Sequence, residues 1–470
     1  MKDFTKLNIE VLIFKNWIFI QFFYLYWTIF FQLGTILYLY IVNNLLELLR
    51  WVKYMSKKYK PVDMNRPVKK PNWFWKIIIL ILTFFFSGPF ATKTKIKKHN
   101  FKDFKEPGLI ISNHGSFVDM SNLSLSMFPH LPCYVIAIDE MIGREWILRQ
   151  IGCFPKRKFT TDLSMIRTMN NIINKEKSWL ALYPEARWSF AGINEDIGDS
   201  IGKMVKLCKC RVVVVNQKGN FLRSPQWNKH PYRKVRNYLD IYEVVTKEEA
   251  LTLSAEEIQE RIEKAFKYDD YKWHFDNKVA IKSKYRAHNI HNILYKCPHC
   301  NQEGHMQSNK TKLWCEKCNT SWEMSEYGEL IQQNNGESKF KLPSDWYRWE
   351  REEVNKEVEN GTYYFEDEVR LEKLINCQVK FKTLGTVKMT HNEKGYTLEG
   401  TLDDGTPFYL NKPCLSTRSV HVEFDYKGKG NCVDIATLEE TWFAYPLNDN
   451  RCICKFNFAT EALFFKSKTK

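Results

Sequence analysis

The stretch "GLIISNHGSFVD" (residues 108–119) places a polar cluster directly behind a short apolar run. The run at 108–112 favours a buried strand. His114 and Asp119 follow it, five positions apart, and on a continuous helix they would diverge by about 140°. They can meet if His114 lies in a loop and Asp119 lies in the first turn of the next helix. Asp119 would then orient the imidazole and leave its second nitrogen as a base.

Further apolar runs at 133–138, 178–183 and 211–215 predict buried strands, and residues 164–177 have helical spacing. This alternation predicts an α/β domain. Two further polar blocks come after apolar runs. The block "FPKR" (154–157) comes after the run at 133–138, and the block "YPEARWS" (183–189) begins at the end of the run at 178–183. Loops at strand ends converge on one crevice. No serine or cysteine lies in a nucleophile elbow, so a His/Asp base with nearby cations predicts direct transfer to a substrate hydroxyl.

The blocks "NHGSFVD", "FPKR" and "YPEARWS", in this order and spacing, resemble the lysophosphatidic acid acyltransferase (1-acylglycerol-3-phosphate acyltransferase) family. That family carries N-H-x4-D, F-x-x-R and P-E-G-T-R blocks on one α/β domain. The resemblance covers roughly residues 70–265. It implies that His114 is the general base and Asp119 its partner. It also implies acyl transfer from acyl-CoA or acyl-acyl carrier protein to lysophosphatidic acid, giving phosphatidic acid in phospholipid biosynthesis.

The same resemblance implies four residues that bind the acceptor, with the arginines on its phosphate: Asn113, Arg157, Glu185 and Arg187. The blocks also depart from the family. Gly and Thr are missing from the third block, whose arginine comes one position early. Asn216 stands where the fourth block has proline, and Ile138 stands where a lysine often precedes the second block. Three alternatives therefore stay open: another lysophospholipid acceptor, arginines in ordinary ion pairs, and a catalytically impaired membrane-tethered scaffold.

The chain has 470 residues and a formal net charge of +16, which favours an anionic partner. Residues 17–42 carry no charge and are long enough for a transmembrane helix. Basic residues follow, so we expect residues 1–60 to form a membrane anchor with its basic flank in the cytosol. A shorter apolar stretch at 77–92 is expected to dip into the interface. Contact of these basic segments with membrane lipids explains much of the positive charge, so no nucleic-acid partner is expected. The catalytic domain, at 61–285, is then predicted to lie on the cytosolic face.

The pairs "CPHC" (297–300) and "CEKC" (315–318) predict a zinc ribbon at 290–332. Cys297, Cys300, Cys315 and Cys318 complete a tetrahedral structural Zn²⁺ site, which leaves His299 and His305 as bystanders. After a linker and a helix near 345–361, residues 340–470 contain seven short strand-like runs and a possible terminal helix at 459–465. This predicts a mainly-β, pleckstrin-homology-like C-terminal domain. The other nine of the 13 cysteines are scattered, which favours a reducing compartment.

Overall fold

The computed structural model describes residues 63–87, 94–160, 163–230, 234–333, 336–374, 381–448 and 451–469. The chain divides into two compact units, Met1–Lys60 and Pro61–Lys470, and every described residue belongs to the second. The transmembrane helix expected at 17–42 therefore lies outside the described residues.

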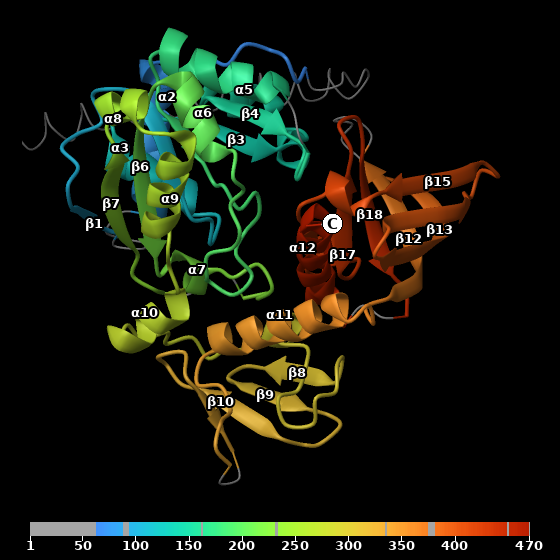
Figure 1. Cartoon of the computed structure of the whole chain (residues 1–470). Coiled ribbons are helices and arrows are strands. Elements are labelled where there is room, and N and C mark those ends of the chain that lie inside the picture. The colour runs from blue at the N-terminus through green and yellow to red at the C-terminus, as the bar shows by residue number, and fades with distance from the viewer. Residues whose placement is uncertain are drawn as a thin grey trace, which may run out of the picture. The chain divides into compact units, whose positions relative to one another are not determined.

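The α/β domain is built on a seven-stranded sheet in the order β1-β7-β6-β2-β5-β3-β4 (Figure 1). Its strands are β1 (Lys95–Lys98), β2 (Gly108–Ser112), β3 (Cys133–Ala137), β4 (Cys153–Lys156), β5 (Leu180–Leu182), β6 (Arg211–Lys218) and β7 (Tyr238–Val245). All neighbours pair in parallel except β6 and β7. The four strands expected from the sequence are present, and the sequence analysis missed β1, β4 and β7.

Both faces of this sheet are covered because successive side chains of a strand point to opposite faces. Leu109 and Ile111 of β2 pack with the core under α5 (Leu163–Asn170), α6 (Ile201–Cys208) and α9 (Ala255–Ala265). Ile110 packs on the other face, with α3 (Asp119–Met127). A strand buried on both faces reads as a continuous apolar run, which is why β2 and β6 could be recognised from the sequence.

Shorter helices complete the domain: α4 (Glu145–Gln150), α7 (Asn220–Arg223), α8 (Lys247–Thr252) and α10 (Asp270–Asp276). Helix α9 begins after Ser254, whose side chain accepts the Glu257 backbone N–H while Glu257 accepts the Ser254 N–H. Thr246 and Glu249 form the same reciprocal bonds before α8. These caps satisfy backbone donors that a helix start leaves unpaired.

Helix α2 (Trp73–Ser87) covers residues 77–87 of the second apolar stretch and begins before it, and residues 88–92 of that stretch lie outside the described residues. Its 15 residues give a length of about 22 Å, short of the roughly 30 Å of a bilayer's hydrocarbon core. Among the described residues, no helix combines the length and apolar character needed to cross a membrane.

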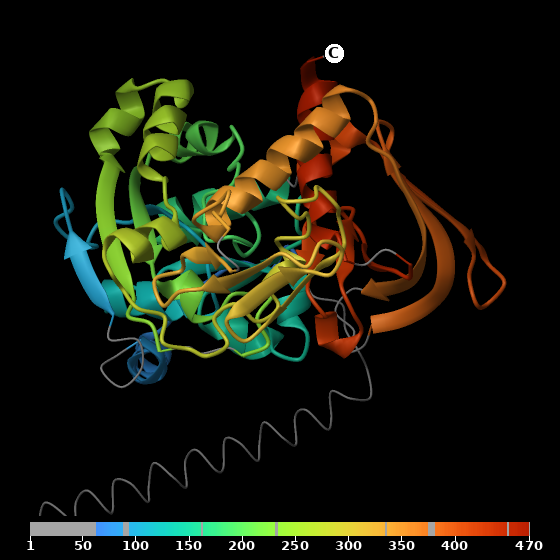
Figure 2. The same cartoon turned by 90° about the horizontal axis from the view of Figure 1, so that it is seen from below.

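The cysteine-rich segment forms a four-stranded antiparallel sheet in the order β11-β10-β9-β8. Its strands are β8 (Met306–Asn309), β9 (Lys312–Cys315), β10 (Ser321–Met324) and β11 (Leu330–Gln332). Helix α11 (Pro343–Glu359) follows, close to the helix expected there. Figures 1 and 2 show α11 passing from the side of α10 to α12.

The C-terminal region is a second seven-stranded sheet, antiparallel throughout, in the order β15-β14-β13-β12-β18-β17-β16. Its strands are β12 (Phe365–Leu374), β13 (Phe381–Asn392), β14 (Gly395–Thr401), β15 (Pro407–Lys412), β16 (His421–Glu423), β17 (Cys432–Ala436) and β18 (Thr441–Pro446). A β-rich region is confirmed. The pleckstrin-homology-like assignment stays a prediction.

Two elements of this region differ from the sequence expectation. The segment "CICKFNF" (452–458) alternates like a strand, but it belongs to helix α12 (Ile453–Thr469). Its buried positions do not alternate, because Phe456 to Glu461 are all buried in succession, as in a helix that is enclosed on most sides. Strand β12 was missed because charged residues occupy most of its exposed positions.

One continuous core joins regions that the sequence analysis treated as separate domains. Phe190 and Phe221 of the α/β domain pack in the same cluster as Trp322 of β10, Trp346 of α11 and Phe458 of α12. The cysteine-rich sheet and the C-terminal sheet are thus packed against the loop that carries the third block, which is the "YPEARWS" segment.

Candidate active site

The site begins where β2 ends. His114 lies in the loop between β2 and α3, and Asp119 is the first residue of α3. His114 Nδ1 lies 2.7 Å from Asp119 Oδ2. This is the arrangement that the sequence analysis described as letting the two residues meet.

Asp119 is fully buried and is held by several donors besides His114. Its Oδ2 accepts the backbone N–H groups of Gly115 at 2.7 Å and Ser116 at 3.0 Å. Its Oδ1 accepts a hydrogen bond from Asn220 Nδ2. Gly115 is needed because an added Cβ would lie only 2.9 Å from Phe221 Cβ. These bonds fix the carboxylate before any substrate binds.

An ionised carboxylate only accepts hydrogen bonds. Asp119 therefore places the proton of neutral His114 on Nδ1 and leaves Nε2 with a lone pair. The His114 side chain is 24% exposed, so its outer edge reaches solvent. Within the described part of the chain, Nε2 has no hydrogen-bond partner.

Aromatic rings enclose the imidazole. Tyr183 stacks on His114 with ring centroids 4.3 Å apart, and Trp188 meets it edge-on at 5.7 Å. Phe117, in the loop itself, is 55% exposed. Phe117, Tyr183 and Trp188 all lie within the sequence blocks, but the sequence analysis assigned them no role. Their place beside the motif residues was the available signal.

Asn113 joins two strands of the sheet. Its Nδ2 donates to the Gln217 carbonyl at 2.8 Å, and its Oδ1 accepts the Gln217 N–H at 2.7 Å. The side chain is buried, and both ends of its amide are used by β6. These contacts fix the end of β2, from which the His114 loop departs.

Glu185 is buried and also bonds to protein groups. It accepts hydrogen bonds from the Glu195 N–H at 2.8 Å and from the Tyr268 hydroxyl at 2.8 and 3.0 Å. Burial raises the pKa of Glu185 to about 8. Its contacts hold the third block against the loop that leads into α10.

The two arginines expected on the acceptor contact the C-terminal region. Arg157 donates to the Leu438 carbonyl at 2.7 Å. Arg187 donates to Ser419 Oγ at 2.5 Å and to Glu461 Oε1 at 3.1 Å. Each donor–acceptor pair is more than 230 residues apart in the chain.

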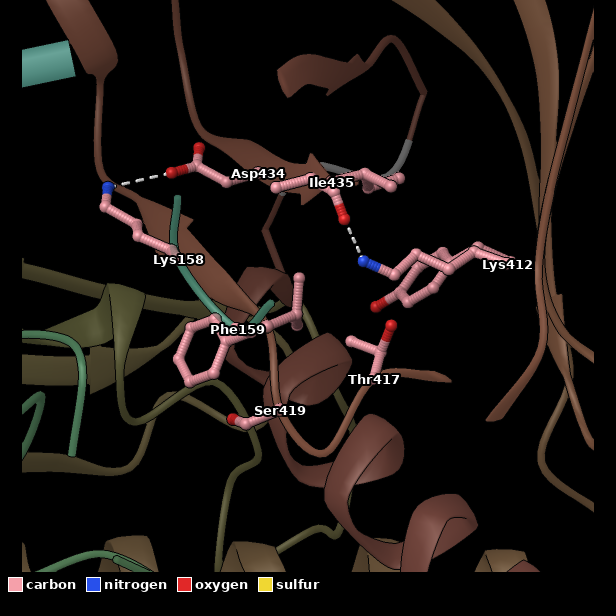
Figure 3. Close-up of a pocket in the computed structure, with 10 residues that line it drawn as sticks. Lys158, Phe159, Lys412, Thr417, Ser419, Asp434 and Ile435 are labelled. Atoms are coloured by element: carbon pink, nitrogen blue, oxygen red, sulfur yellow. Dashed lines mark hydrogen bonds and ion pairs between the residues drawn. The ribbon is translucent and has the colours of Figure 1, made fainter. Parts of the chain in front are cut away.

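A further cation that sequence reasoning passed over lies next to the second block. Lys158 contacts Asp434 at 2.9 Å, Glu423 at 3.2 Å and Asp139 at 3.6 Å. Burial by itself lowers the pKa of Lys158, but these carboxylates outweigh it and hold the pKa well above its ordinary value. Lys158 lines a small pocket together with Asp434, Lys412 and Ser419 (Figure 3). Two of its acids lie over 260 residues away, and no sequence signal marks them.

The four cysteines of the two C-x2-C pairs converge. Cys297 Sγ lies 3.7 Å from Cys318 Sγ, and Cys300 Sγ lies 3.7 Å from Cys315 Sγ. All four sulfurs lie within 4.8 Å of one another. A tetrahedron with metal–sulfur bonds of about 2.3 Å has edges of about 3.8 Å. The cluster therefore fits one tetrahedral metal ion.

Comparison with known proteins bears on the α/β domain. The Acyltransferase family profile matches residues 92–216. The crystal structure of the 1-acyl-sn-glycerophosphate (LPA) acyltransferase PlsC from Thermotoga maritima is similar at 14% sequence identity and a TM-score of 0.31. The similarity covers 48% of this chain and 94% of that chain. No curated protein matches. Residues 92–216, which hold His114, Asp119 and the third block, form an acyltransferase domain.

Proposed function

We propose that this protein transfers a fatty acyl group from an acyl-CoA or acyl-carrier-protein thioester to the free hydroxyl of a lysophospholipid. Lysophosphatidic acid, giving phosphatidic acid, is the first acceptor to test. The observation that carries the proposal is the 2.7 Å contact between His114 Nδ1 and Asp119 in an acyltransferase domain.

The geometry suits general-base catalysis. His114 Nε2 takes the proton of the acceptor hydroxyl as that oxygen attacks the thioester carbonyl. The carbon–sulfur bond then breaks, and His114 returns the proton to the departing thiolate. Asp119 stabilises the imidazolium that exists between these two transfers. Proton transfer of this kind is typically worth 10²- to 10⁴-fold in rate.

The acceptor stays open between lysophosphatidic acid and another lysophospholipid. Arg157 and Arg187 bond to the C-terminal region, and this favours testing acceptors that differ at the phosphate. The decisive assay gives purified full-length protein in detergent a panel of lysophospholipids with both donor types and follows the diacyl product. An absence of acyl transfer to every acceptor would reject the proposal.

We place this reaction at the cytosolic face of a membrane. Helix α2 supports contact with a membrane because several of its apolar side chains are exposed within the described part of the chain, with exposures between 47% and 63% at Trp73, Ile77, Ile81, Leu82 and Phe85. Exposed apolar surface of this extent favours lipid contact. Flotation of the full chain with liposomes tests it, and a variant with α2 residues changed to serine should float less.

We also propose that Cys297, Cys300, Cys315 and Cys318 hold one structural Zn²⁺. The closed set of four thiolates and the sulfur spacing support this. Metal analysis of freshly reduced protein should find about one zinc per chain, and Cys318→Ser should lose it. Chelation should destabilise the C-terminal half more than the His114 loop. Zinc-free protein with unchanged stability would contradict the proposal.

A further inference from the structure

Arg187 belongs to a buried charge cluster that joins the third block to the C-terminal region. Both of its Nη atoms lie 3.1 Å from Glu461 Oε1 of α12, and Glu195 Oε2 lies 3.5 Å away. Ser419 bonds to both sides, accepting from Arg187 and donating to Glu461 at 2.6 Å. The Arg187 side chain is 1% exposed.

The charges in this cluster are balanced. Arg351 of α11 forms ion pairs with both Glu195 and Glu461, so two guanidinium groups face two carboxylates. Arg187 Nε has no acceptor among the described residues, but this atom is buried. A phosphate that reached Arg187 would have to displace carboxylates that also neutralise Arg351, which would leave buried charges unpaired.

The residues on either side of Arg187 hold His114. Tyr183 stacks on the imidazole, and Trp188 meets its edge. The Ser189 backbone N–H donates to the His114 carbonyl at 2.7 Å. A shift of the third block would therefore move the aromatic rings that contact the His114 side chain and, at the same time, the His114 backbone.

The backbone of this block needs an anchor. Ala186 has a φ of 55°, which is unfavourable for a residue with a Cβ. Such a conformation persists only where surrounding contacts fix it. Glu185 and Arg187 flank Ala186, and both are held by buried partners.

We propose that Arg187 is a positioning residue for the acyl transfer and that Glu461 and Ser419 are its partners. The C-terminal region thereby completes the active site, and the acceptor phosphate is bound by groups other than Arg187. This inference rests on the proposed function.

The test compares kcat and KM in variants of the C-terminal partners. Glu461→Gln keeps the shape of the side chain but removes its charge, and Ser419→Ala removes only the shared hydroxyl. Because a small misplacement of a reacting group is costly, kcat should fall about tenfold in each. The KM for lysophosphatidic acid should stay within about twofold. Ser419→Ala is the milder change if Glu461→Gln does not fold.

Lys468→Gln is the matched control. Lys468 also lies on α12 and bonds across to the α/β domain, at Asp199, but this pair is exposed. Its kcat should equal that of the wild type. A lower acceptor KM in Glu461→Gln would overturn the inference, because it would show that Arg187 is freed to bind phosphate. Unchanged kcat in both partner variants would also overturn it.

A failure of the proposed function would be recognised separately, as wild-type protein that acylates no acceptor. The inference then stands or falls on the His114 ring resonances in protein with isotope-labelled histidine. They should shift in Glu461→Gln and in Ser419→Ala but not in Lys468→Gln. Unshifted His114 resonances in both partner variants would reject the positioning role.

Discussion

Two pairs of a basic side chain and a carboxylate define this site, and they differ in nearly every respect. His114 and Asp119 are five residues apart, and the His114 side chain is 24% exposed. Arg187 and Glu461 are 274 residues apart, and the Arg187 side chain is 1% exposed. The first pair can meet a substrate, whereas the second is enclosed by protein. The role of an arginine in a sequence motif thus depends on its surroundings in the fold as much as on the motif.

The largest effect is expected at the first pair. His114→Ala should lower kcat by 10²-fold or more because it removes the base. Thermal stability should stay close to wild type because the side chain is partly exposed and lies in a loop. Steady-state kinetics and a thermal melt check this. A variant that keeps more than a tenth of the wild-type rate would contradict the role of His114.

Breaking the second pair should act on stability. Glu461→Ala leaves Arg187 and Arg351 with less buried counter-charge, which typically costs about 3–5 kcal/mol in the free energy of unfolding. Urea denaturation measures it. Lys468→Ala, at an exposed pair on the same helix, should cost less than about 1 kcal/mol. An equal loss of unfolding free energy in the two variants would contradict the expected difference between the buried pair and the exposed pair.

Acid should also weaken the packing between the C-terminal sheet and α12. His391 stacks on Tyr396 at 3.8 Å and on Phe456 of α12 at 6.0 Å. Burial lowers the pKa of His391 to about 3, against about 6.5 when unfolded. The unfolded chain therefore binds the proton more readily between these values, and stability falls as the pH is lowered through 6.5.

The loss from this histidine should reach about 1.6 kcal/mol between pH 6.5 and pH 5. Unfolding free energies of wild type and His391→Gln at both pH values test it, and the variant should show a smaller decrease. The same decrease in both proteins would assign the acid sensitivity to other groups.

The smallest effect is expected at Ala186. Ala186→Gly should stabilise the protein by about 0.5–1 kcal/mol because glycine adopts the positive φ without strain. Its kcat should stay within about twofold of wild type if the anchors of the block still hold. A destabilised variant would show that the Ala186 backbone is not strained.

The sequence predicted those parts of the molecule that depend on local spacing. The strand at 108–112, the loop position of His114 and the helical start at Asp119 followed from apolar runs and helix geometry. The contact from Arg187 to Glu461 could not be predicted because no local pattern links residues 274 positions apart. The segment 452–458 was misassigned because α12 is buried on most of its sides there, so its sequence lacks the polar face that marks a surface helix.

The separation between Arg187 and Glu461 also sets an order in time. A ribosome adds about 5–20 residues per second, so the 274 residues between them take roughly 14–55 s to synthesise. During that interval the nascent α/β domain already contains His114 and Asp119, but the third block lacks its partner. Catalytic competence should therefore arise late in translation, after α12 has emerged and docked.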